Sequence, residues 1–595
     1  MLHRQRRPPL RRRYPIWRLV RANFYDIGLL LRESWVALAG FAVLALAGTL
    51  YIHYGHPAHL GFAASLFETL KLVTLQTGLD LPNDLLGEVL FFLIPLLGLA
   101  LIFQSVLNFG RLLLDKGSRR EAWQVALAST YRDHVIVVGL GRVGMRVVAQ
   151  LLASGHAPVV IERDLSSPFV ERALNLKVPV VVGDASEVVV LRQAGLPRAR
   201  AVVATIDDDL ANIEISLTAR SVRPGVRVVL RVFSEALDQN LERGFGPNAA
   251  FSASALAAPT YVAAAISRDI EHALPIEGQL LGITRLTVAP ESELVGLQRS
   301  LEMQHRVRIL RHTNTTGELL APSSERKLGR GDHVLLLGTL PALEALRQQN
   351  AAGHKSAFIP PARLEHPTAE YDTIIVCGLG KVGYRVVQQL AALIPRPRIV
   401  VVRRNDGRPD FAQRINRLPG VRVVLGDARD AEVLQEAGIE RSYAVAALTS
   451  DDLLNLQIGL AARRLRPDVN IVQRSFSDAL AEKLDDMFGI HTVYSTAGLA
   501  SATLAAAAVL GDITHAFATD DALFSADQVQ VRAGDLFDGQ TVEAIRARHA
   551  ALLAAVRRDG APQTLPALDY ALAPGDNITL LAPLDVLARL RTLLR

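Results

Sequence analysis

The stretch HVIVVGLGRVGMRVVAQL at residues 134–151 is repeated at residues 373–390 as TIIVCGLGKVGYRVVQQL. Each copy contains a short β-branched run, then the pattern G-x-G-x-x-G, then a helical pattern. A strand, a glycine turn and a helix in this order open a dinucleotide-binding fold, in which the free N–H groups of the helix N-terminus face a pyrophosphate. The repeat therefore predicts two such domains in one chain.

Further landmarks make the duplication much stronger than the glycine pattern alone. Gly183 pairs with Gly426, Thr205 with Thr449, and Arg231 with Arg474, at offsets of 243, 244 and 243 residues. Within each unit β-branched runs alternate with helical patterns, which predicts an α/β doubly wound parallel sheet. The stretches GRGDHVLLLG and APGDNITLLA near the end of each unit predict a smaller α+β C-terminal lobe behind each sheet.

Two stretches near the N-terminus carry no charge and are long enough to cross a bilayer. They cover residues 35–52 and 89–107, and 18 helical residues measure about 27 Å, close to the thickness of a hydrocarbon core. Lys71 is the only Lys or Arg between them, whereas several basic residues follow the second stretch, so we expect both ends of the pair in the cytoplasm. A signal peptide is the alternative for the first stretch, although no cleavage site stands out and a second span follows.

The charge and composition locate the protein and restrict its partners. The formal net charge is +6, but residues 1–34 hold nine Arg against two acidic residues, so the remainder is close to neutral. The basic charge therefore belongs to a juxtamembrane tail, and we expect a lipid bilayer and no nucleic acid as a partner. Arg far outnumbers Lys, and Ala and Leu abound, which indicates a high-GC bacterial gene and a multi-pass protein of the bacterial inner membrane. The single cysteine, Cys377, excludes an intrachain disulfide and is expected to be a buried, inert thiol.

The connection between the two spans predicts a pore. Residues 61–76 are too short to cross the bilayer and too apolar for a plain loop, which favours a re-entrant half-helix. Span, half-helix, loop and span resemble the two-transmembrane potassium channels, in which four subunits surround one pore. The filter of that family is TVGYG, whereas residues 74–84 read TLQTGLDLPND, so the selectivity for a monovalent or divalent cation stays open. The predicted pore residues are Thr77, Gly78, Leu79 and Asp80.

Two functional roles are predicted for single residues of this region. Asp80, repeated around a fourfold axis, would supply a ring of carboxylates at the mouth of a wide cation pathway, and a solvated loop residue is the alternative. Gly98, three residues after Pro95, is a candidate gate at which the inner helix could bend. Helix packing is the equal alternative for Gly98, because glycine is common in membrane helices for that reason.

The doubled half of the chain resembles the regulator-of-potassium-conductance (RCK) domain, also known as the TrkA-N and TrkA-C domains. The motifs that carry the resemblance are the glycine turn with a basic residue inside it, Gly-Asp-Ala after the third strand, and TIDDDLAN or TSDDLLN after the fourth. The expected divisions are a tail at 1–34, a pore domain at 35–108 with a filter-like loop at 77–82, a linker at 109–132, a first RCK N-lobe with crossing helix at 133–273 and C-lobe at 274–348, a linker at 349–370, and a second N-lobe with crossing helix at 371–513 and C-lobe at 514–595.

The resemblance implies that the protein binds an adenine nucleotide, with NAD(H) as the ligand of the first unit. Glu162 ends the second strand there, where a carboxylate accepts hydrogen bonds from ribose hydroxyls. The second unit has Arg403 at this place, so its ligand stays open between ADP, ATP, NADP and an empty site. Helix capping is the alternative for the two Asn residues. The candidate residues are Gly139, Gly141, Arg142, Val143, Gly144, Glu162, Arg163, Gly183, Asp184, Ala185, Thr205 and Asn212 in the first unit, and Gly378, Gly380, Lys381, Val382, Gly383, Arg403, Arg404, Gly426, Asp427, Ala428, Thr449 and Asn455 in the second.

Three functions follow as hypotheses from this organisation. The first is a homotetrameric cation channel gated by nucleotide binding to a cytoplasmic ring of RCK domains. The second is a nicotinamide-dependent oxidoreductase, which we disfavour because the C-lobes offer no convincing acid, base or metal cluster, so we expect no enzyme. The third is a membrane-anchored regulatory subunit of a separate potassium transporter, which the altered filter favours.

Overall fold

The computed structural model describes residues 35–58, 60–114, 116–233, 241–321, 323, 325–350, 373–404, 409–476 and 492–594. The expected basic tail at 1–34 and nearly all of the expected linker at 349–370 lie outside these residues.

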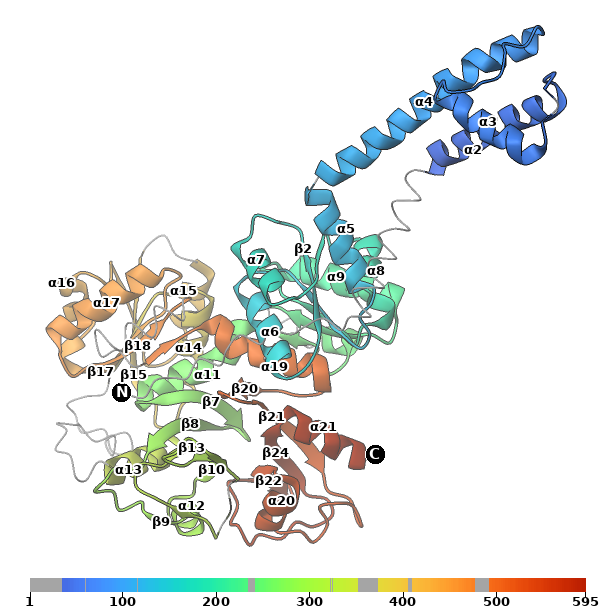
Figure 1. The fold of residues 1–595 in the computed structure, drawn as a ribbon. Helices are drawn as coiled ribbons and strands as arrows, with labels where there is room; N and C mark the ends of the chain where they lie inside the picture. The colour runs from blue at the N-terminus through green and yellow to red at the C-terminus, as the bar shows by residue number, and fades with distance from the viewer. Residues whose placement is uncertain are drawn as a thin grey trace.

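Three apolar helices form one end of the elongated molecule (Figure 1). They are α2 (Trp35–Tyr54), α3 (Phe62–Val73) and α4 (Leu85–Leu114), and they pack on one another around Leu72, Val73 and Ile94. Of the part of the chain that the structure describes, one helical stretch, Leu85–Ser105, is long and apolar enough to cross a membrane, and Ala39–Tyr54 is a shorter apolar helix. The short α3 lies where the half-helix is expected.

The linker expected at 109–132 is mostly helical. Helix α4 continues to Leu114 and is followed after one residue by α5 (Lys116–Ala128), which packs against the first sheet. Leu127 and Ala128 of α5 are completely buried in the core of that sheet. The apolar helices are therefore joined to the first of the two repeated units through a helix that packs into the core of that unit.

Each unit begins with a six-stranded parallel sheet covered by helices, here called the N-lobe. Both sheets have the same strand order. The first strand lies in the middle, the second and third strands follow on one side of it, and the later strands follow on the other side, so the strand order reverses at the first strand. In the first N-lobe the order is β3 (Val180–Val182), β2 (Pro158–Glu162), β1 (Val135–Val138), β4 (Ala201–Ala204), β5 (Arg227–Arg231) and β6 (Ala250–Phe251). In the second it is β16 (Val421–Leu425), β15 (Arg398–Arg403), β14 (Thr373–Cys377), β17 (Ser442–Ala447), β18 (Asn470–Arg474) and β19 (Thr492–Tyr494).

The helices between these strands repeat as well. The predicted β-branched runs form strands because they are buried on both faces of the sheet. In the first N-lobe the helices are α6 (Arg142–Ala153), α7 (Pro168–Asn175), α8 (Val188–Gln193) and α9 (Asp209–Val222). In the second they are α14 (Lys381–Ala391), α15 (Pro409–Ile415), α16 (Ala431–Glu436) and α17 (Asp452–Leu465).

Each C-lobe is built on a five-stranded antiparallel sheet, and the two sheets have equivalent strand orders. The first contains β7 (Ile270–Ile276), β8 (Gln279–Thr287), β13 (His333–Thr339), β10 (Arg308–Thr313) and β11 (Leu319–Leu320), with α12 (Gln298–His305) and α13 (Leu340–Asn350). The short strands β9 (Gly296–Leu297) and β12 (Lys327–Leu328) of this C-lobe pair with each other in a separate two-stranded sheet. The second contains β20 (Ala516–Ala518), β21 (Leu523–Gln530), β24 (Asn577–Pro583), β22 (Leu552–Arg558) and β23 (Ala561–Thr564), with α20 (Val542–His549) and α21 (Leu584–Leu593).

The Ala-rich crossing helices are exchanged between the units. Helix α11 (Ala253–Ile266) follows the first sheet but packs on α14, and its Ala257 and Tyr261 belong to the core of the second N-lobe. Helix α19 (Thr496–Leu510) follows the second sheet but packs on α6, with Ala502 and Ala505 in the core of the first N-lobe. The two helices also contact each other, so the units form one interlocked body (Figure 1).

Candidate nucleotide site

A tight glycine turn joins β1 to α6 and β14 to α14. Gly139 and Gly378 have φ angles of +85° and +99°, which favour glycine. A Cβ on Gly144 would lie 2.0 Å from the carbonyl oxygen of Gly139, and a Cβ on Gly383 would lie 2.0 Å from that of Gly378. Only glycine therefore lets each helix start this close to its strand.

The turn leaves room for a ligand on its outer side. A Cβ on Gly141 or Gly380 would meet nothing within 4 Å, and these two residues are the N-caps of α6 and α14. No side chain caps either helix, so the first N–H groups face open space. These positions fit a pyrophosphate, which binds to free N–H groups at a helix N-terminus.

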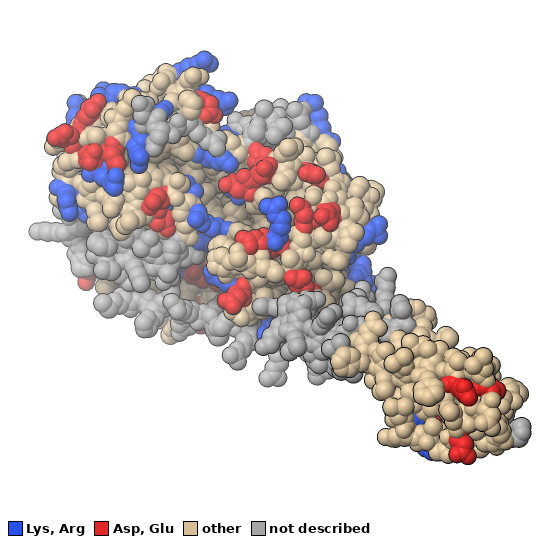
Figure 2. Space-filling model, turned by 90° about the horizontal axis from the view of Figure 1, so that it is seen from above, with Lys and Arg blue, Asp and Glu red and all other residues tan. Residues whose placement is uncertain are grey.

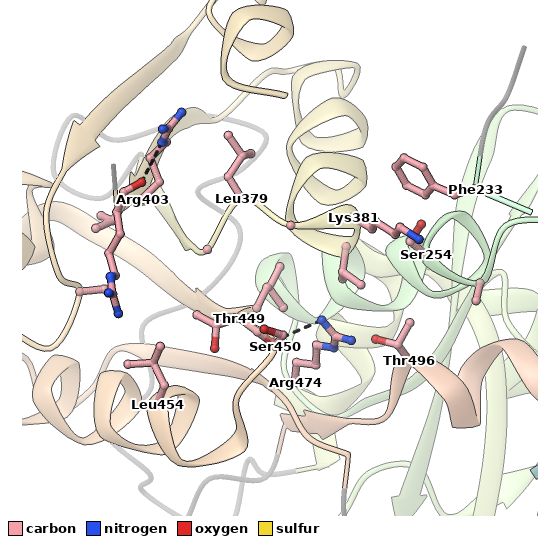
Figure 3. A pocket seen from close by; sticks show the side chains of 18 of the residues that line it. Phe233, Ser254, Leu379, Lys381, Arg403, Thr449, Ser450, Leu454, Arg474 and Thr496 are labelled. Atoms are coloured by element: carbon pink, nitrogen blue, oxygen red, sulfur yellow. Dashed lines mark hydrogen bonds between the residues drawn. The ribbon is translucent and has the colours of Figure 1, made fainter. Parts of the chain in front are cut away.

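Each glycine turn opens into a cavity. The first cavity measures about 880 Å³ and the second about 570 Å³ (Figure 3 shows the second). Of the candidate residues, the first cavity is lined by Gly139, Gly141, Arg142, Val143, Glu162, Arg163, Gly183, Asp184, Ala185 and Thr205. The second is lined by Gly378, Gly380, Lys381, Val382, Arg403, Arg404, Gly426, Asp427, Ala428 and Thr449.

The two Asn residues lie beneath the cavities and not on their walls. Asn212 and Asn455 are completely buried. Asn212 accepts a hydrogen bond from Ile206 N at 3.1 Å and donates to Arg231 O at 2.7 Å, so it joins the turn after β4 to the end of β5. Helix capping is also excluded for them, since the N-caps of α9 and α17 are Asp208 and Asp451.

Pairing Thr205 with Thr449 was wrong by one residue. Thr205 N donates to Val138 O, and the equivalent bond to Cys377 O comes from Leu448 N. Asn455 accepts from Thr449 N just as Asn212 accepts from Ile206 N. The two threonines therefore occupy successive positions of the turn, and only Thr205 donates its hydroxyl across to the glycine turn, at 2.9 Å from Gly139 O.

Each cavity is completed by residues of the other unit. Ser450, Arg474 and Phe476 of the second unit line the first cavity, and Asp207, Arg231 and Phe233 of the first unit line the second. The two cavities thus meet at the contact between the N-lobes. These residues were missed as site residues, although RVF at 231–233 and RSF at 474–476 stand at a constant offset of 243 residues.

The basic residue inside each glycine turn stacks on an aromatic ring of the other unit. The Arg142 guanidinium lies 3.9 Å from the centre of the Phe476 ring. Lys381 Nζ lies 5.2 Å from the centre of the Phe233 ring. Such cation–π contacts orient the two cations while leaving their hydrogens available to phosphate oxygens.

Charged groups surround the boundary between the cavities. Asp207 accepts from Arg231 at 2.7 Å, and Lys381 of the other unit lies 3.5 Å from the same carboxylate oxygen. Among the described residues Arg474 has no ion pair of this kind, because Ser450 stands at the position equivalent to Asp207, although the carboxylate of Asp452 attracts it from a greater distance. Burial lowers the pKa of the Arg474 guanidinium, and repulsion by Arg142 and Arg231 acts in the same direction.

The acid of each Gly-Asp-Ala motif is held by local donors. Ser186 donates to Asp184 through its backbone N–H and its hydroxyl, at 2.9 and 2.8 Å, and these bonds lower the pKa of the Asp184 carboxyl. Arg429 binds both oxygens of Asp427, which likewise lowers the pKa of Asp427. Both side chains are therefore anionic acceptors at neutral pH.

The pore candidates lie in the loop between α3 and α4. Thr77 donates its hydroxyl to Glu68 of α3 at 3.0 Å, and Leu79 N donates back to the Thr77 hydroxyl at 3.3 Å. Gly78 and Asp80 are exposed on the single chain. The contact between Thr77 and Glu68 was not predicted, because a single acidic residue in an apolar half-helix does not indicate which residue it binds.

Gly98 lies where α4 crosses α3. A Cβ on Gly98 would come within 2.7 Å of a Val73 methyl carbon, so the glycine allows the two helices to approach closely. This favours the packing interpretation, and a role as a gate stays a prediction.

Family models match most of the two N-lobes and the end of the chain. The TrkA-N domain matches residues 135–253 and 374–496, and the TrkA-C domain matches residues 528–595. Among curated proteins, the Trk system potassium uptake protein TrkA homolog of Archaeoglobus fulgidus is 27% identical over 364 residues, which cover 57% of this chain and 73% of the relative. The probable potassium channel protein 2 of Methanocaldococcus jannaschii is 26% identical over 180 residues, 29% of this chain and 51% of the relative.

A solved structure resembles the whole chain in fold. The structure named "GsuK channel bound to NAD" matches with a TM-score of 0.51 at 19% identity, and the match covers 96% of this chain and 99% of the other. The structure named "GsuK Channel" gives the same TM-score at 20% identity. The likeness in fold thus extends over nearly the whole length of both chains. Its two TrkA-N domains and its TrkA-C domain place the chain in the family of proteins with tandem TrkA-N/TrkA-C (RCK) domains.

Proposed function

We propose that the chain is one subunit of a homotetrameric cation channel of the bacterial inner membrane, gated by adenine nucleotides that bind between its N-lobes. The observation that carries this proposal is the helical connection between the apolar helices and the N-lobe that forms the first cavity. Helix α5 follows α4 and is part of the first N-lobe, whose core buries Leu127 and Ala128. Movement of this N-lobe therefore moves α5 and pulls on α4.

The apolar end supports a place in the membrane. Figure 2 shows this end as almost bare of charge except near its tip, whereas Lys, Arg, Asp and Glu are spread over the rest of the surface in view. Large side chains such as Leu46, Phe67, Phe92 and Phe103 are more than half exposed on the single chain. Lipid and neighbouring subunits would cover them, and both chain ends would then be cytoplasmic.

The exposed loop before α4 would line the pathway. Four copies of Asp80 around one axis would attract cations at the mouth, and the backbone near Thr77 and Gly78 would face the ion. The names of two relatives, a potassium uptake protein and a probable potassium channel, support potassium as one permeant ion. The loss of the TVGYG pattern supports a wider pathway that also passes other monovalent or divalent cations.

The first cavity is proposed to bind NAD(H). Glu162 Oε1 accepts from Arg163 N and Asp164 N at 2.8 and 2.9 Å, which holds the carboxylate at the end of β2, where ribose hydroxyls bind in this fold. The NAD in the name of the matched channel structure agrees with this choice. Binding shifts the channel only by the difference in affinity between its open and closed shapes.

The test is ion flux into liposomes that contain this full-length chain alone. We expect potassium flux that changes by at least about threefold when NAD or NADH is added, and Glu162→Arg should abolish this change without abolishing flux, because it opposes ribose binding in one cavity only. Reversal potentials in mixed potassium, sodium and calcium solutions then report selectivity, and Asp80→Asn should weaken the preference for divalent ions.

The second candidate function is a membrane-anchored regulatory subunit of a separate potassium transporter. The altered filter and the similarity to Trk system proteins favour it. Its signature in the same experiment is nucleotide binding with no flux from the chain alone. That result would overturn the channel and leave the nucleotide sensor in place.

A further inference from the structure

The end of the second strand carries opposite charges in the two N-lobes. In the first, Val138 pairs with Ile161, and Gly139 N donates to Ile161 O at 3.0 Å. In the second, Cys377 pairs with Val402, and Gly378 N donates to Val402 O at 2.9 Å. The next residue is Glu162 in one sheet and Arg403 in the other. The register of the strands thus makes these two residues equivalent.

Arg403 is held in place as a donor. Its Nε donates to Arg404 O at 3.1 Å, and the described residues offer its two Nη groups no partner. Figure 3 shows Arg403 on the side of the cavity away from Lys381 and Phe233, with Leu379 of the glycine turn between them. Lys381 and the start of α14 therefore suit a pyrophosphate, while the free fork of Arg403 suits a second anion on the ribose.

The residues that line the two cavities also differ in charge, and the second cavity is the more basic of the two. The second cavity is lined by five basic residues (Arg231, Lys381, Arg403, Arg404 and Arg474) against three acidic ones (Asp207, Asp209 and Asp427). The first is lined by four basic residues (Arg142, Arg163, Arg231 and Arg474) against five acidic ones (Glu162, Asp184, Asp207, Asp208 and Glu214). Asp427 is moreover paired with Arg429, which reduces its repulsion of an anion.

We infer that the second cavity selects an adenine nucleotide with a phosphate on the 2′ position of its ribose, the NADP(H) class, whereas the first selects an unphosphorylated ribose. A carboxylate at this corner accepts bonds from the 2′ and 3′ hydroxyls and repels a phosphate, and an arginine there does the reverse. The inference rests on the proposed binding of nucleotides in these cavities. It makes one chain a sensor of two different nucleotide pools.

The test is competition binding on the purified full-length chain, with radiolabelled NADP and unlabelled 2′,5′-ADP, 3′,5′-ADP, 5′-ADP and ATP as competitors. We expect 2′,5′-ADP to compete at least about tenfold better than the others. Arg403→Gln should remove this preference and leave the binding of labelled NAD, at the first cavity, unchanged, because glutamine brings neither a cation for the phosphate nor a carboxylate that would favour NAD in the second cavity. Arg398→Gln is the matched control, because it makes the same charge change at the exposed start of the same strand, and it should keep the preference.

Other outcomes would overturn the inference in distinct ways. Equal competition by 5′-ADP and 2′,5′-ADP, or a preference for ATP, would show that the second cavity does not recognise a phosphate on the ribose. A preference for 3′,5′-ADP would contradict the 2′ position. If labelled NAD binds and changes ion flux while NADP does not bind, only this inference fails; if no nucleotide binds at all, the nucleotide gating proposed above fails with it.

Discussion

At the scale of single residues, the third glycine of each turn is predicted to decide whether its N-lobe can form. Gly144→Ala places a Cβ 2.0 Å from Gly139 O, and Gly383→Ala does the same with Gly378 O. A clash with backbone cannot be relieved by turning a side chain, so α6 or α14 must move off its sheet. We expect a loss of about 3 kcal/mol or more in the free energy of unfolding of the affected N-lobe, measured by urea denaturation.

Gly141→Ala is the control for this prediction. Its φ angle is −88°, and an added Cβ meets nothing within 4 Å, so the stability should fall by no more than about 1 kcal/mol, the cost of an alanine at the N-cap of α6. Equal losses from Gly141→Ala and Gly144→Ala would contradict the packing argument.

Residues that act within their own unit could be predicted from the sequence, because strand, turn and helix are local. Glu162 and Arg403 follow directly from the end of a β-branched run. Phe476 and Arg474 could not be assigned to the first cavity, since they are more than 300 residues from Gly139 in the chain and reach it only through the contact between units. Thr449 was misplaced because a threonine at nearly the right spacing hid a shift of one residue.

At the scale of elements, the exchanged crossing helices make each N-lobe depend on the other half of the sequence. Ala505 of α19 is completely buried in the core of the first N-lobe, and Ala257 of α11 is completely buried in that of the second. Ala505→Leu should overpack the contact with α6 by about 1–3 kcal/mol. We therefore expect faster hydrogen exchange in β1 and β4, although the substitution lies in the second half of the chain.

Ala257→Leu is the matched substitution and should loosen β14 and β17 instead. Hydrogen exchange followed by mass spectrometry on the full chain measures both variants. Loosening of the sheet that precedes each helix in sequence, and not of its exchanged partner, would contradict the observed packing.

The existence of these helices was predictable, and the resemblance implied that each packs against a neighbouring domain, whereas the exchange between the two units of one chain was not predicted. An Ala-rich helix such as α19 is apolar on every side, which predicts burial without naming the surface that buries it. The short β6 also escaped prediction, because Ala250 and Phe251 are too few to form a strand pattern. The strands β1 to β5 were predictable, since continuous Val and Ile runs are typical of a buried parallel sheet.

At the scale of the whole molecule, a buried ion pair joins the two C-lobes beneath the N-lobes. Glu302 of α12 is completely buried, and both of its carboxylate oxygens lie 2.7 Å from Nη1 of Arg546 on α20. Glu302 also accepts from Ile309 N at 2.8 Å, and Arg546 binds Glu543 at 2.6 Å. Both Glu302 oxygens and both Arg546 Nη groups thus have partners, whereas Arg546 Nε is buried without one among the described residues. The charges of the pair are shielded from water, which makes the loss of one partner costly.

Glu302→Leu alone should lower the free energy of unfolding by about 3–5 kcal/mol, because it leaves the Arg546 cation buried without its main partner. The double variant Glu302→Leu/Arg546→Leu removes both charges and should recover most of this loss, apart from about 1 kcal/mol for the Ile309 N–H that loses its acceptor. Urea denaturation of the two single variants and the double variant measures the coupling. Additive losses would mean that the two C-lobes are held by their apolar contact alone, around Leu281, Phe517 and Phe524. A large coupling would instead show that one ion pair fixes how the two sensor units are held together, and with them the shared boundary of the cavities.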